Sequence, residues 1–327
     1  MRHHVLRDGR DELTVSVLCL GTMYFGTTIP EETAFALLDR YVAAGGDFLD
    51  TANCYAFWAD GASPTGGESE ALLGRWLRSR GLAGQVKVAS KVGAGPARPG
   101  EPYDAHNREG LSAQVITDQA RASRDRLGVE RIDLYYAHAD DRATPLRETL
   151  SAFGALIAEG TVGMIAASNY PAWRLALARD VAAEAGLPRY AAIQQRHTYL
   201  EPRPIRMPIT DAIQLPVTDE LIDYATANPE LTVLAYSPLL NGAYTRADRP
   251  LHPYYDHPGS AARLAVLREV AKELGATCNQ VVLAWLLGGE RPILPVLGVS
   301  TVAQLDEALE SLDLVLDPAT RQRLAEA

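Results

Sequence analysis

The stretch IDLYYAHADDRATPLRETLSAFGALIAEGTVGMIAAS, residues 132–168, contains one complete strand–helix–strand unit. Its two ends, residues 132–138 and 163–168, are short and mostly apolar, which is typical of strands covered on both faces. Between them Pro145 stands near the start of a helical pattern that runs to Glu159, and Gly160 ends it. Such a unit predicts two parallel strands joined by a helix.

The same alternation extends in both directions from this unit. Six more strand-like segments occupy residues 15–20, 47–51, 86–91, 192–196, 233–237 and 293–298. Further helical patterns cover residues 31–44, 68–79, 112–127, 173–185, 261–274 and, after Thr277 as N-cap, the chain up to Leu287. Eight strands in 327 residues predict an α/β fold, a (β/α)8 TIM barrel with long loops at its C-terminal face. No shift in composition divides the chain, so we expect one domain over residues 1–327.

An open doubly wound sheet is the alternative fold. Its phosphate-binding loop has the pattern G-x-G-x-x-G directly after the first strand. Here the first strand is followed by GTMYFG at residues 21–26, which lacks that pattern. The sequence therefore favours the barrel.

The composition argues against several classes of function. The formal net charge of -10 disfavours general binding to nucleic acids or anionic membranes, which requires excess positive charge. The three cysteines, Cys19, Cys54 and Cys278, cannot all pair with one another and lack metal-ligand spacing, so we expect a reducing, cytoplasmic compartment. Since no signal-peptide pattern and no run of about 18 apolar residues is present, we expect neither a leader nor a membrane span.

Three long connections follow the third, sixth and seventh strands, at residues 93–110, 197–218 and 240–259. In a barrel they rise from the C-terminal rim, where active sites lie. They are either ordinary surface loops or the walls of a substrate pocket, to which Tyr24 and Trp58 would also belong because both closely follow strands. The rings in these loops are Tyr103, His106, His197, Tyr199, Tyr244, His252, Tyr254, Tyr255 and His257.

Polar residues end three neighbouring strands: Asp50, with Tyr55 shortly after it, then Lys91, then His138. Each alone has an ordinary structural explanation, but together they would meet at one rim of a barrel. Tyrosine is a weak acid, with a pKa of about 10, and a nearby cation such as Lys91 lowers that pKa. Asp50 can hold Lys91 in place, and His138 can orient a carbonyl oxygen, so the group suits acid–base chemistry on a carbonyl.

These motifs resemble those of the aldo-keto reductases over nearly the whole chain. The resemblance rests on LGTM at residues 20–23, D-T-A-x-x-Y at residues 50–55, Ser90-Lys91, His138, Ser168-Asn169, YSPL at residues 236–239 and the segment 295–307. It implies a TIM-barrel oxidoreductase that reduces an aldehyde or ketone, keto sugars included, by direct hydride transfer without a metal. Tyr55 would be the general acid, Lys91 and Asp50 would tune it, and His138 would orient the carbonyl.

The resemblance also implies a nicotinamide cofactor, NADP(H) more than NAD(H). Ser168, Asn169 and Gln194 would bind the carboxamide, and Tyr236 would stack on the nicotinamide. Arg246 either reaches the pyrophosphate or is an exposed loop residue. The remaining expected contacts are Gly21, Thr22 and Met23 near the first strand, Ser237, Pro238, Leu239 and Gly242 at the pyrophosphate, and Gly298, Ser300, Thr301, Gln304 and Glu307 at the adenosine.

The chain departs from many relatives at two places. A Tyr-Asn pair that often follows the position of Gln194 is replaced by a run beginning QRHTYL at residue 195, and no Lys or Arg stands in residues 298–301. The second departure predicts weak discrimination between NADPH and NADH.

Other functions stay open at this point. One is a cofactor-binding regulatory subunit with slow turnover, like the relatives that serve potassium channels. Another is a barrel hydrolase built on Asp50, Asp140 and Asp141, with or without a metal at His138. The sequence specifies neither the substrate nor the oligomeric state.

Overall fold

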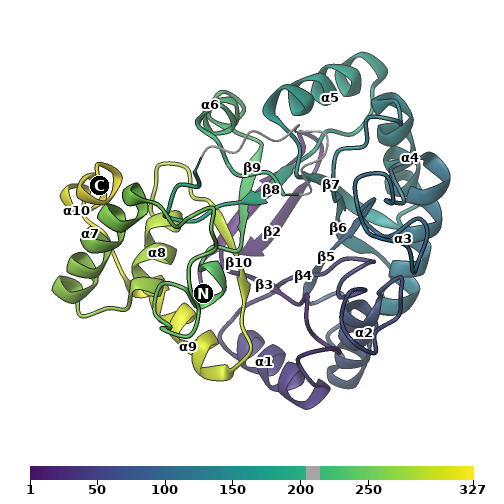
Figure 1. The fold of residues 1–327 in the computed structure, drawn as a ribbon. Coiled ribbons are helices and arrows are strands. Elements are labelled where there is room, and N and C mark those ends of the chain that lie inside the picture. The colour runs from purple at the N-terminus through teal and green to yellow at the C-terminus, as the bar shows by residue number, and fades with distance from the viewer. Residues whose placement is uncertain (204–213) are drawn as a thin grey trace.

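Eight parallel strands close into a barrel in this computed structural model, which describes residues 1–203 and 214–327 (Figure 1). Residues 204–213 of the expected sixth loop lie outside the described residues. The last strand pairs with both its predecessor and the first strand, which confirms the TIM barrel and rules out the open sheet. The barrel strands are β3 (Cys19–Gly21), β4 (Phe48–Asp50), β5 (Lys87–Val92), β6 (Ile132–Ala137), β7 (Val162–Ser168), β8 (Ala192–Arg196), β9 (Thr232–Tyr236) and β10 (Leu294–Gly298).

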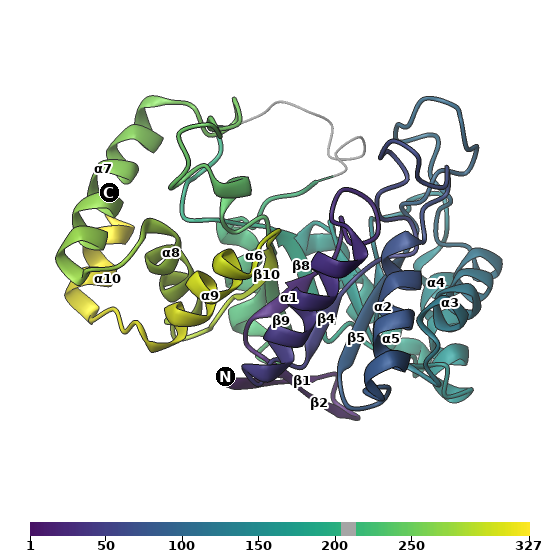
Figure 2. The same cartoon turned by 90° about the horizontal axis from the view of Figure 1, so that it is seen from below.

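Helices surround the barrel, and three of them, α6, α9 and α10, are absent from the sequence prediction. Beside the barrel, α7, α8 and α10 pack on one another around a second apolar core (Figure 2). The helices are α1 (Glu31–Ala43), α2 (Glu68–Arg80), α3 (Ala113–Leu127), α4 (Leu146–Ala158), α5 (Ala172–Ala185), α6 (Asp219–Ala227), α7 (Pro258–Leu274), α8 (Cys278–Leu287), α9 (Val302–Glu310) and α10 (Pro318–Ala325). Short 3₁₀ turns lie at η1 (Leu240–Gly242) and η2 (Ser311–Asp313).

The helix boundaries follow local chemistry that the sequence displays. The expected N-cap Thr277 accepts a hydrogen bond from the Gln280 backbone, whose side chain accepts one from the Thr277 backbone in return. Gly128 ends α3 with φ 66°, a left-handed conformation that glycine adopts without strain.

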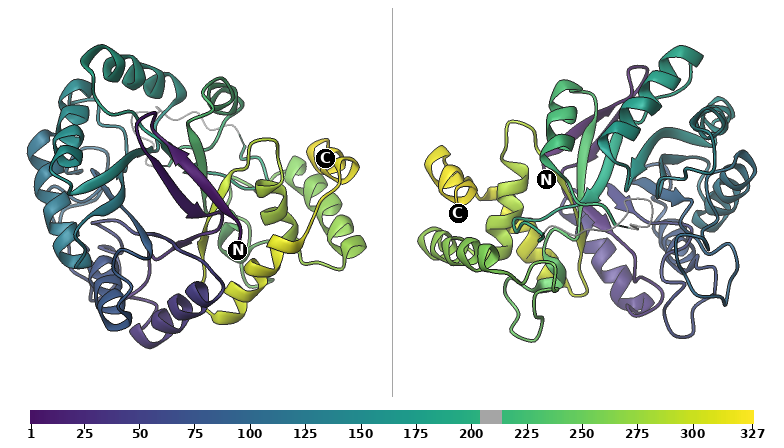
Figure 3. Two further views of the ribbon diagram at one scale, coloured as in Figure 1. Left: turned by 180° about the vertical axis from the view of Figure 1, so that it is seen from behind. Right: turned by 45° about the horizontal axis from the view of Figure 1, so that its top comes forward.

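The predicted first strand, residues 15–20, is wrong in its first part. Residues 12–16 instead form β2 (Glu12–Ser16), which pairs antiparallel with β1 (His3–Arg7). His4 Nε2 lies 3.0 Å from the Thr232 hydroxyl at the start of β9, and the Ser16 amide donates to Asp47 just before β4 at 2.7 Å. The hairpin therefore lies across the N-terminal end of the barrel, opposite the long loops (Figures 2 and 3).

Candidate active site

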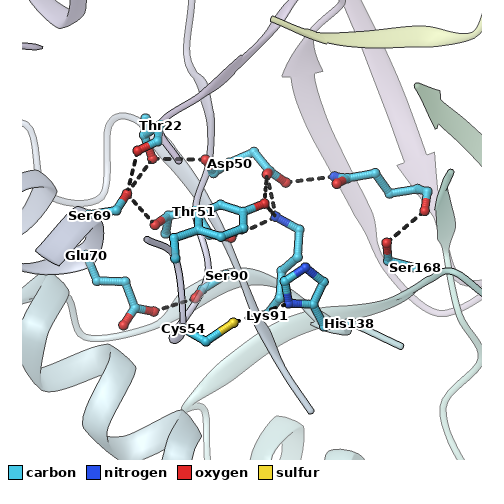
Figure 4. Close-up of polar contacts among 12 residues, drawn as sticks. Thr22, Asp50, Thr51, Cys54, Ser69, Glu70, Ser90, Lys91, His138 and Ser168 are labelled. Atoms are coloured by element: carbon cyan, nitrogen blue, oxygen red, sulfur yellow. Dashed lines mark hydrogen bonds and ion pairs between the residues drawn. The ribbon is translucent and has the colours of Figure 1, made fainter. Parts of the chain in front are cut away.

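Asp50 and Lys91 meet at the C-terminal ends of β4 and β5 (Figure 4), and Tyr55 joins them from the loop after β4. Lys91 Nζ donates to the Tyr55 hydroxyl at 2.6 Å and to the Thr51 carbonyl at 2.8 Å, and it forms an ion pair with Asp50. The Tyr55 hydroxyl lies 3.3 Å from Asp50 Oδ1. The strand order dictates this meeting, because β4 and β5 are adjacent and parallel.

His138 completes the group from the next strand. It directly follows β6, and its backbone amide donates to the Val92 carbonyl at 2.8 Å. Its ring lies 5.8 Å from that of Tyr55, edge to face, and its Nδ1 is 3.9 Å from the Cys54 sulfur. The structure thus brings together all four residues that the sequence proposed for catalysis.

Burial controls the protonation of the two aromatic acid–base groups. It raises the pKa of Tyr55 well above the ordinary value, and the Asp50 carboxylate raises it further. This outweighs the lowering expected from Lys91, so Tyr55 is a phenol at neutral pH. Burial, with the charges of Lys91 and Arg108, holds the pKa of His138 well below its ordinary value, so this ring is neutral.

A layer of buried hydroxyls lies beside Asp50 (Figure 4). The Thr22 hydroxyl donates to the Asp50 carbonyl at 3.0 Å, and the Ser69 hydroxyl lies 2.9 Å from that of Thr22 and 2.8 Å from that of Thr51. Thr22 is fully buried. Its neighbours Gly21 and Met23 line the cavity, so within this expected cofactor segment Thr22 supports Asp50 from behind.

One cavity of about 1570 Å³ extends from the catalytic group to α9. Tyr55 and His138 line one part of it, and Ser300, Gln304 and Glu307 line another. Besides these it is lined by the expected contacts Gly21, Met23, Tyr24, Asp50, Trp58, Ser168, Asn169, Gln194, Tyr236, Ser237, Pro238, Leu239, Gly242, Arg246 and Gly298.

The residues expected at the nicotinamide form a hydrogen-bonded row across β7, β8 and β9. Gln194 Nε2 donates to Asp50 Oδ2 at 2.7 Å, and the Ser168 hydroxyl donates to the Gln194 carbonyl at 2.8 Å. Asn169 donates to the His138 carbonyl at 3.0 Å and accepts from the Tyr236 hydroxyl at 2.9 Å. This row joins the expected carboxamide contacts to the catalytic group.

The residues expected at the adenosine are bonded mainly to one another. Gln304 Oε1 accepts from the Ser300 amide at 2.8 Å, while Thr301 caps α9 by accepting from the Gln304 amide at 3.2 Å. Asn279, which the sequence reasoning missed, donates to Glu307 at 3.2 Å, and its Oδ1 is buried without a hydrogen-bond partner. Its only signal in the sequence is its place two residues after the N-cap Thr277.

Arg246 lines the cavity and forms an ion pair with a neighbouring residue. Its guanidinium pairs with Asp248 at 2.5 Å, and the side chain is exposed. The structure therefore shows an exposed loop arginine beside the cavity, and its contact with a pyrophosphate stays a prediction.

Aromatic side chains surround the mouth of the cavity near Tyr55. Tyr24 and Trp58 are 39% and 51% exposed, and both line the cavity, as do Phe57 and Tyr103. The centre of the Phe57 ring lies 5.0 Å from the centre of the Trp58 ring and 4.9 Å from that of the Tyr103 ring. We call these four residues the aromatic mouth.

Of the other rings of the long loops, the tyrosines lie beside the cavity or in the second core, and none of the four histidines lines the cavity. Tyr254 and Tyr255 line the cavity together with Tyr103. Tyr199 and Tyr244 are buried in the second core, to which Tyr255 also belongs, and the Tyr199 hydroxyl donates to the Leu324 carbonyl at 3.0 Å.

Glu109 is a further residue that sequence reasoning missed. Its Oε1 accepts hydrogen bonds from Asn53 Nδ2 at 2.9 Å, from the Gly93 amide at 2.8 Å and from the Gly95 amide at 3.1 Å. Asn53 lies two residues before Tyr55, and Gly93 lies two residues after Lys91. This carboxylate therefore connects the loop that carries Tyr55 to the loop that follows Lys91 at the end of β5.

The carboxyls considered for a hydrolase are engaged elsewhere. Asp140 pairs with Arg174 at 2.9 Å, and Asp141 accepts from the Leu111 amide at 2.8 Å and the Thr144 hydroxyl at 2.6 Å. Within residues 1–203 and 214–327 no cluster of His, Cys, Asp and Glu side chains is arranged to hold a metal ion. No helix in these ranges is both long and apolar enough to cross a membrane.

Comparison with known proteins identifies the family. The profile of the "Aldo/keto reductase family" matches residues 17–327. An uncharacterized oxidoreductase, YrpG, of Bacillus subtilis is 32% identical, over 94% of this chain and 91% of its own length. A norsolorinic acid reductase of Emericella nidulans is 31% identical, over 93% of this chain and 76% of its own length. An aryl-alcohol dehydrogenase of Pestalotiopsis microspora is 28% identical, over 96% of this chain and 79% of its own length. This chain therefore belongs to the aldo/keto reductase family of oxidoreductases.

Proposed function

We propose that this protein reduces the carbonyl group of an aldehyde or ketone to an alcohol, with Tyr55 as the general acid. The observation that carries the proposal is the 2.6 Å hydrogen bond from Lys91 Nζ to the Tyr55 hydroxyl, beside the ion pair of Lys91 with Asp50. When bound, a nicotinamide cofactor supplies the hydride that reaches the carbonyl carbon.

Tyr55 gives its proton to the carbonyl oxygen. The raised pKa keeps the phenol protonated at neutral pH, which is the form an acid needs. Lys91 donates to the phenol oxygen, and the phenol itself donates to Asp50 Oδ1 over a long 3.3 Å. A substrate oxygen in the cavity would replace Asp50 as the acceptor of that hydrogen. Once the proton has left, Lys91 stabilises the negative charge, and Asp50 holds Lys91 in position.

His138 orients the substrate oxygen. Its ring is neutral because burial lowers its pKa, so it carries one N–H donor and one acceptor nitrogen. Burial raises the pKa of Cys54, so it is a thiol that can donate to Nδ1. In that tautomer the ring proton lies on Nε2, which would donate to the carbonyl oxygen. Two donors, Tyr55 and His138, would thus polarise one oxygen.

The residues present fit a nicotinamide dinucleotide. A cavity of about 1570 Å³ exceeds the roughly 300 to 1,000 Å³ of ordinary ligand pockets, so a dinucleotide and a substrate have room together. Ser168, Asn169 and Gln194 supply amide and hydroxyl groups near Asp50, and the free Asn279 oxygen can accept from an adenine amino group.

We further propose a modest preference for NADP(H) over NAD(H). The Ser300 hydroxyl and Arg246 line the cavity and can contact a 2′-phosphate. Arg246 is already paired with Asp248 in solvent, so its contribution is small. Dissociation constants from quenching of intrinsic fluorescence measure this directly, and an equal or tighter complex with NADH would refute it.

The aromatic mouth favours an aryl carbonyl as substrate. Flat rings stack well on Phe57, Trp58 and their neighbours. The printed names of two relatives, an aryl-alcohol dehydrogenase and a norsolorinic acid reductase, agree with this class. Keto sugars are the alternative.

One assay separates the enzyme from a slowly turning regulatory subunit. With NADPH and a reactive benzaldehyde, we expect multiple turnovers per second, within the usual enzyme range of about 1 to 10³ per second. A single slow turnover per bound cofactor would instead support the regulatory alternative.

We also propose that one domain spans residues 1–327 and works in the cytoplasm, in line with its three free cysteines.

A further inference from the structure

Arg196 ends β8 on the face that looks into the cavity. Gln194 of this strand bonds to Asp50, while Gln195, which also reaches the cavity, donates to the Tyr170 carbonyl at 2.9 Å. Since side chains alternate along a strand, Arg196 shares the face of Gln194, roughly 6.6 Å nearer the rim. It lines the same cavity as Tyr55.

The guanidinium of Arg196 has hydrogen-bond donors that the described residues do not satisfy. Nη1 donates to Gln214 Oε1 at 2.8 Å, and the group lies 5.5 Å from the Tyr255 ring. Its Nε is buried without a hydrogen-bond partner. Arg174, by contrast, is paired with Asp140 at 2.9 Å, whereas the described part of the chain supplies Arg196 with no ion pair. Arg108 and Arg321 also have buried nitrogens without a partner, but neither lines the cavity.

This arrangement has a chemical consequence. A guanidinium offers five N–H donors in a planar fork that matches carboxylate and phosphate oxygens. Donors withdrawn from water and left unpaired are costly, so a ligand that pairs with them gains affinity. The group lies 5.5 Å from the Tyr255 ring, and Gln214 fixes one of its ends, so within residues 1–203 and 214–327 Nε is the buried donor left for an anion.

We propose that Arg196 binds an anionic oxygen group of a ligand in this cavity: a carboxylate or ionised phenol on the carbonyl substrate. A phosphate of the dinucleotide has the same chemistry and is the second source. This inference rests on the proposed function and names acid-substituted aryl carbonyls as the substrate class. Binding of such a ligand to Arg196 can be measured without turnover.

The test compares 4-carboxybenzaldehyde with its methyl ester, which has the same ring and aldehyde but no charge. In Arg196→Met we expect kcat/KM for the acid to fall about 10- to 100-fold, since a charge-assisted hydrogen bond is lost. The ester should change less than about twofold, and Arg196→Lys should recover part of the loss. Arg147→Gln, which removes an exposed charge on α4, is the control for net charge.

The dissociation constants of NADPH and NADH, measured on the same proteins, distinguish the two sources. A selective loss of the acid supports the substrate group. An equal loss for acid and ester, with both dinucleotides bound roughly tenfold more weakly, supports a phosphate. If Arg196→Met folds with an unchanged Tm and alters neither the acid-to-ester ratio nor dinucleotide binding, the proposal is overturned. If the native protein reduces neither aldehyde, the proposed function fails, and calorimetry of 4-carboxybenzaldehyde binding still tests Arg196.

Discussion

The two ends of the active-site cavity are built in opposite ways. At the chemical end, Lys91 and Asp50 are 0% and 1% exposed and are bonded to each other. At the adenosine end, Gly298 and Ser300 are exposed, and residues 298–307 contain no Lys or Arg. At the chemical end the side chains are already held by one another without a ligand. At the adenosine end an added side chain could still form a new contact with the cofactor and increase the free energy of binding. Chemistry should therefore be easy to destroy by mutation, and cofactor preference should be easy to change.

The support behind the chemical end explains its rigidity. Ser69 at the start of α2 bonds to Thr22 and Thr51, so the loops after β3 and β4 share one buried hydroxyl. Glu70, next to it, is fully buried and pairs with Arg126 of α3 at 2.7 Å. Removing one partner from a buried charged pair is strongly destabilising, so these contacts resist rearrangement.

The largest effect is expected for Tyr55→Phe. The change removes one hydroxyl and keeps the ring, so the fold and cofactor binding should persist while carbonyl reduction falls by about 10²- to 10⁴-fold. The loss should appear mainly in kcat, because the proton moves in the transition state. Steady-state kinetics with a reactive aldehyde measure it, and circular dichroism with a cofactor titration provides the control. Near-normal turnover by the folded variant would remove Tyr55 from the mechanism.

Lys91→Met should have the next largest effect. It takes the hydrogen-bond donor from Tyr55 and leaves Asp50 buried without its cation, so we expect kcat to fall roughly 10²-fold and Tm to fall as well. The double variant with Tyr55→Phe should be only slightly worse than Tyr55→Phe alone, since the two residues act as a unit. Fully additive losses would mean that Lys91 acts independently of Tyr55.

Glu109 tests whether the chemical end depends on its loop contacts. Glu109→Gln keeps one acceptor oxygen but loses the charge that three N–H groups share, so we expect kcat to fall roughly tenfold by misplacing Tyr55 and Lys91. KM for the cofactor should not change. Glu101→Gln is the matched control, because Glu101 lies in the same loop but pairs with Arg98 in solvent. A lowered Tm with an unchanged kcat would give Glu109 a structural role only.

The contrast between the two ends also explains what the sequence could predict. Asp50, Lys91 and His138 end apolar strands, and parallel strands in a barrel bring such ends together whatever the loops do. Glu109 and Asn279 bond to residues that are near in space but far apart in the chain. No spacing in the sequence therefore predicts their contacts. The sequence mispredicts the N-terminal hairpin because residues 15–20 are apolar apart from Ser16 and resemble one strand. The antiparallel pairing of β2 with β1, which separates β2 from β3, depends on residues 3–7.

The smallest effect is expected where the cavity is open. Gly298→Lys adds a cation at the end of β10, beside the residues proposed to hold the adenosine. A Cβ atom at this position would meet no heavy atom within 4 Å, so the substitution should fold without strain. An exposed pairing with a phosphate contributes about 1 kcal/mol, which corresponds to roughly a fivefold tighter complex with NADPH. NADH has no 2′-phosphate, so its dissociation constant should stay within about twofold, and Gly298→Gln should tighten neither complex. Equal gains for both dinucleotides would indicate that the added charge reaches the pyrophosphate, and no gain for NADPH would place its 2′-phosphate away from β10.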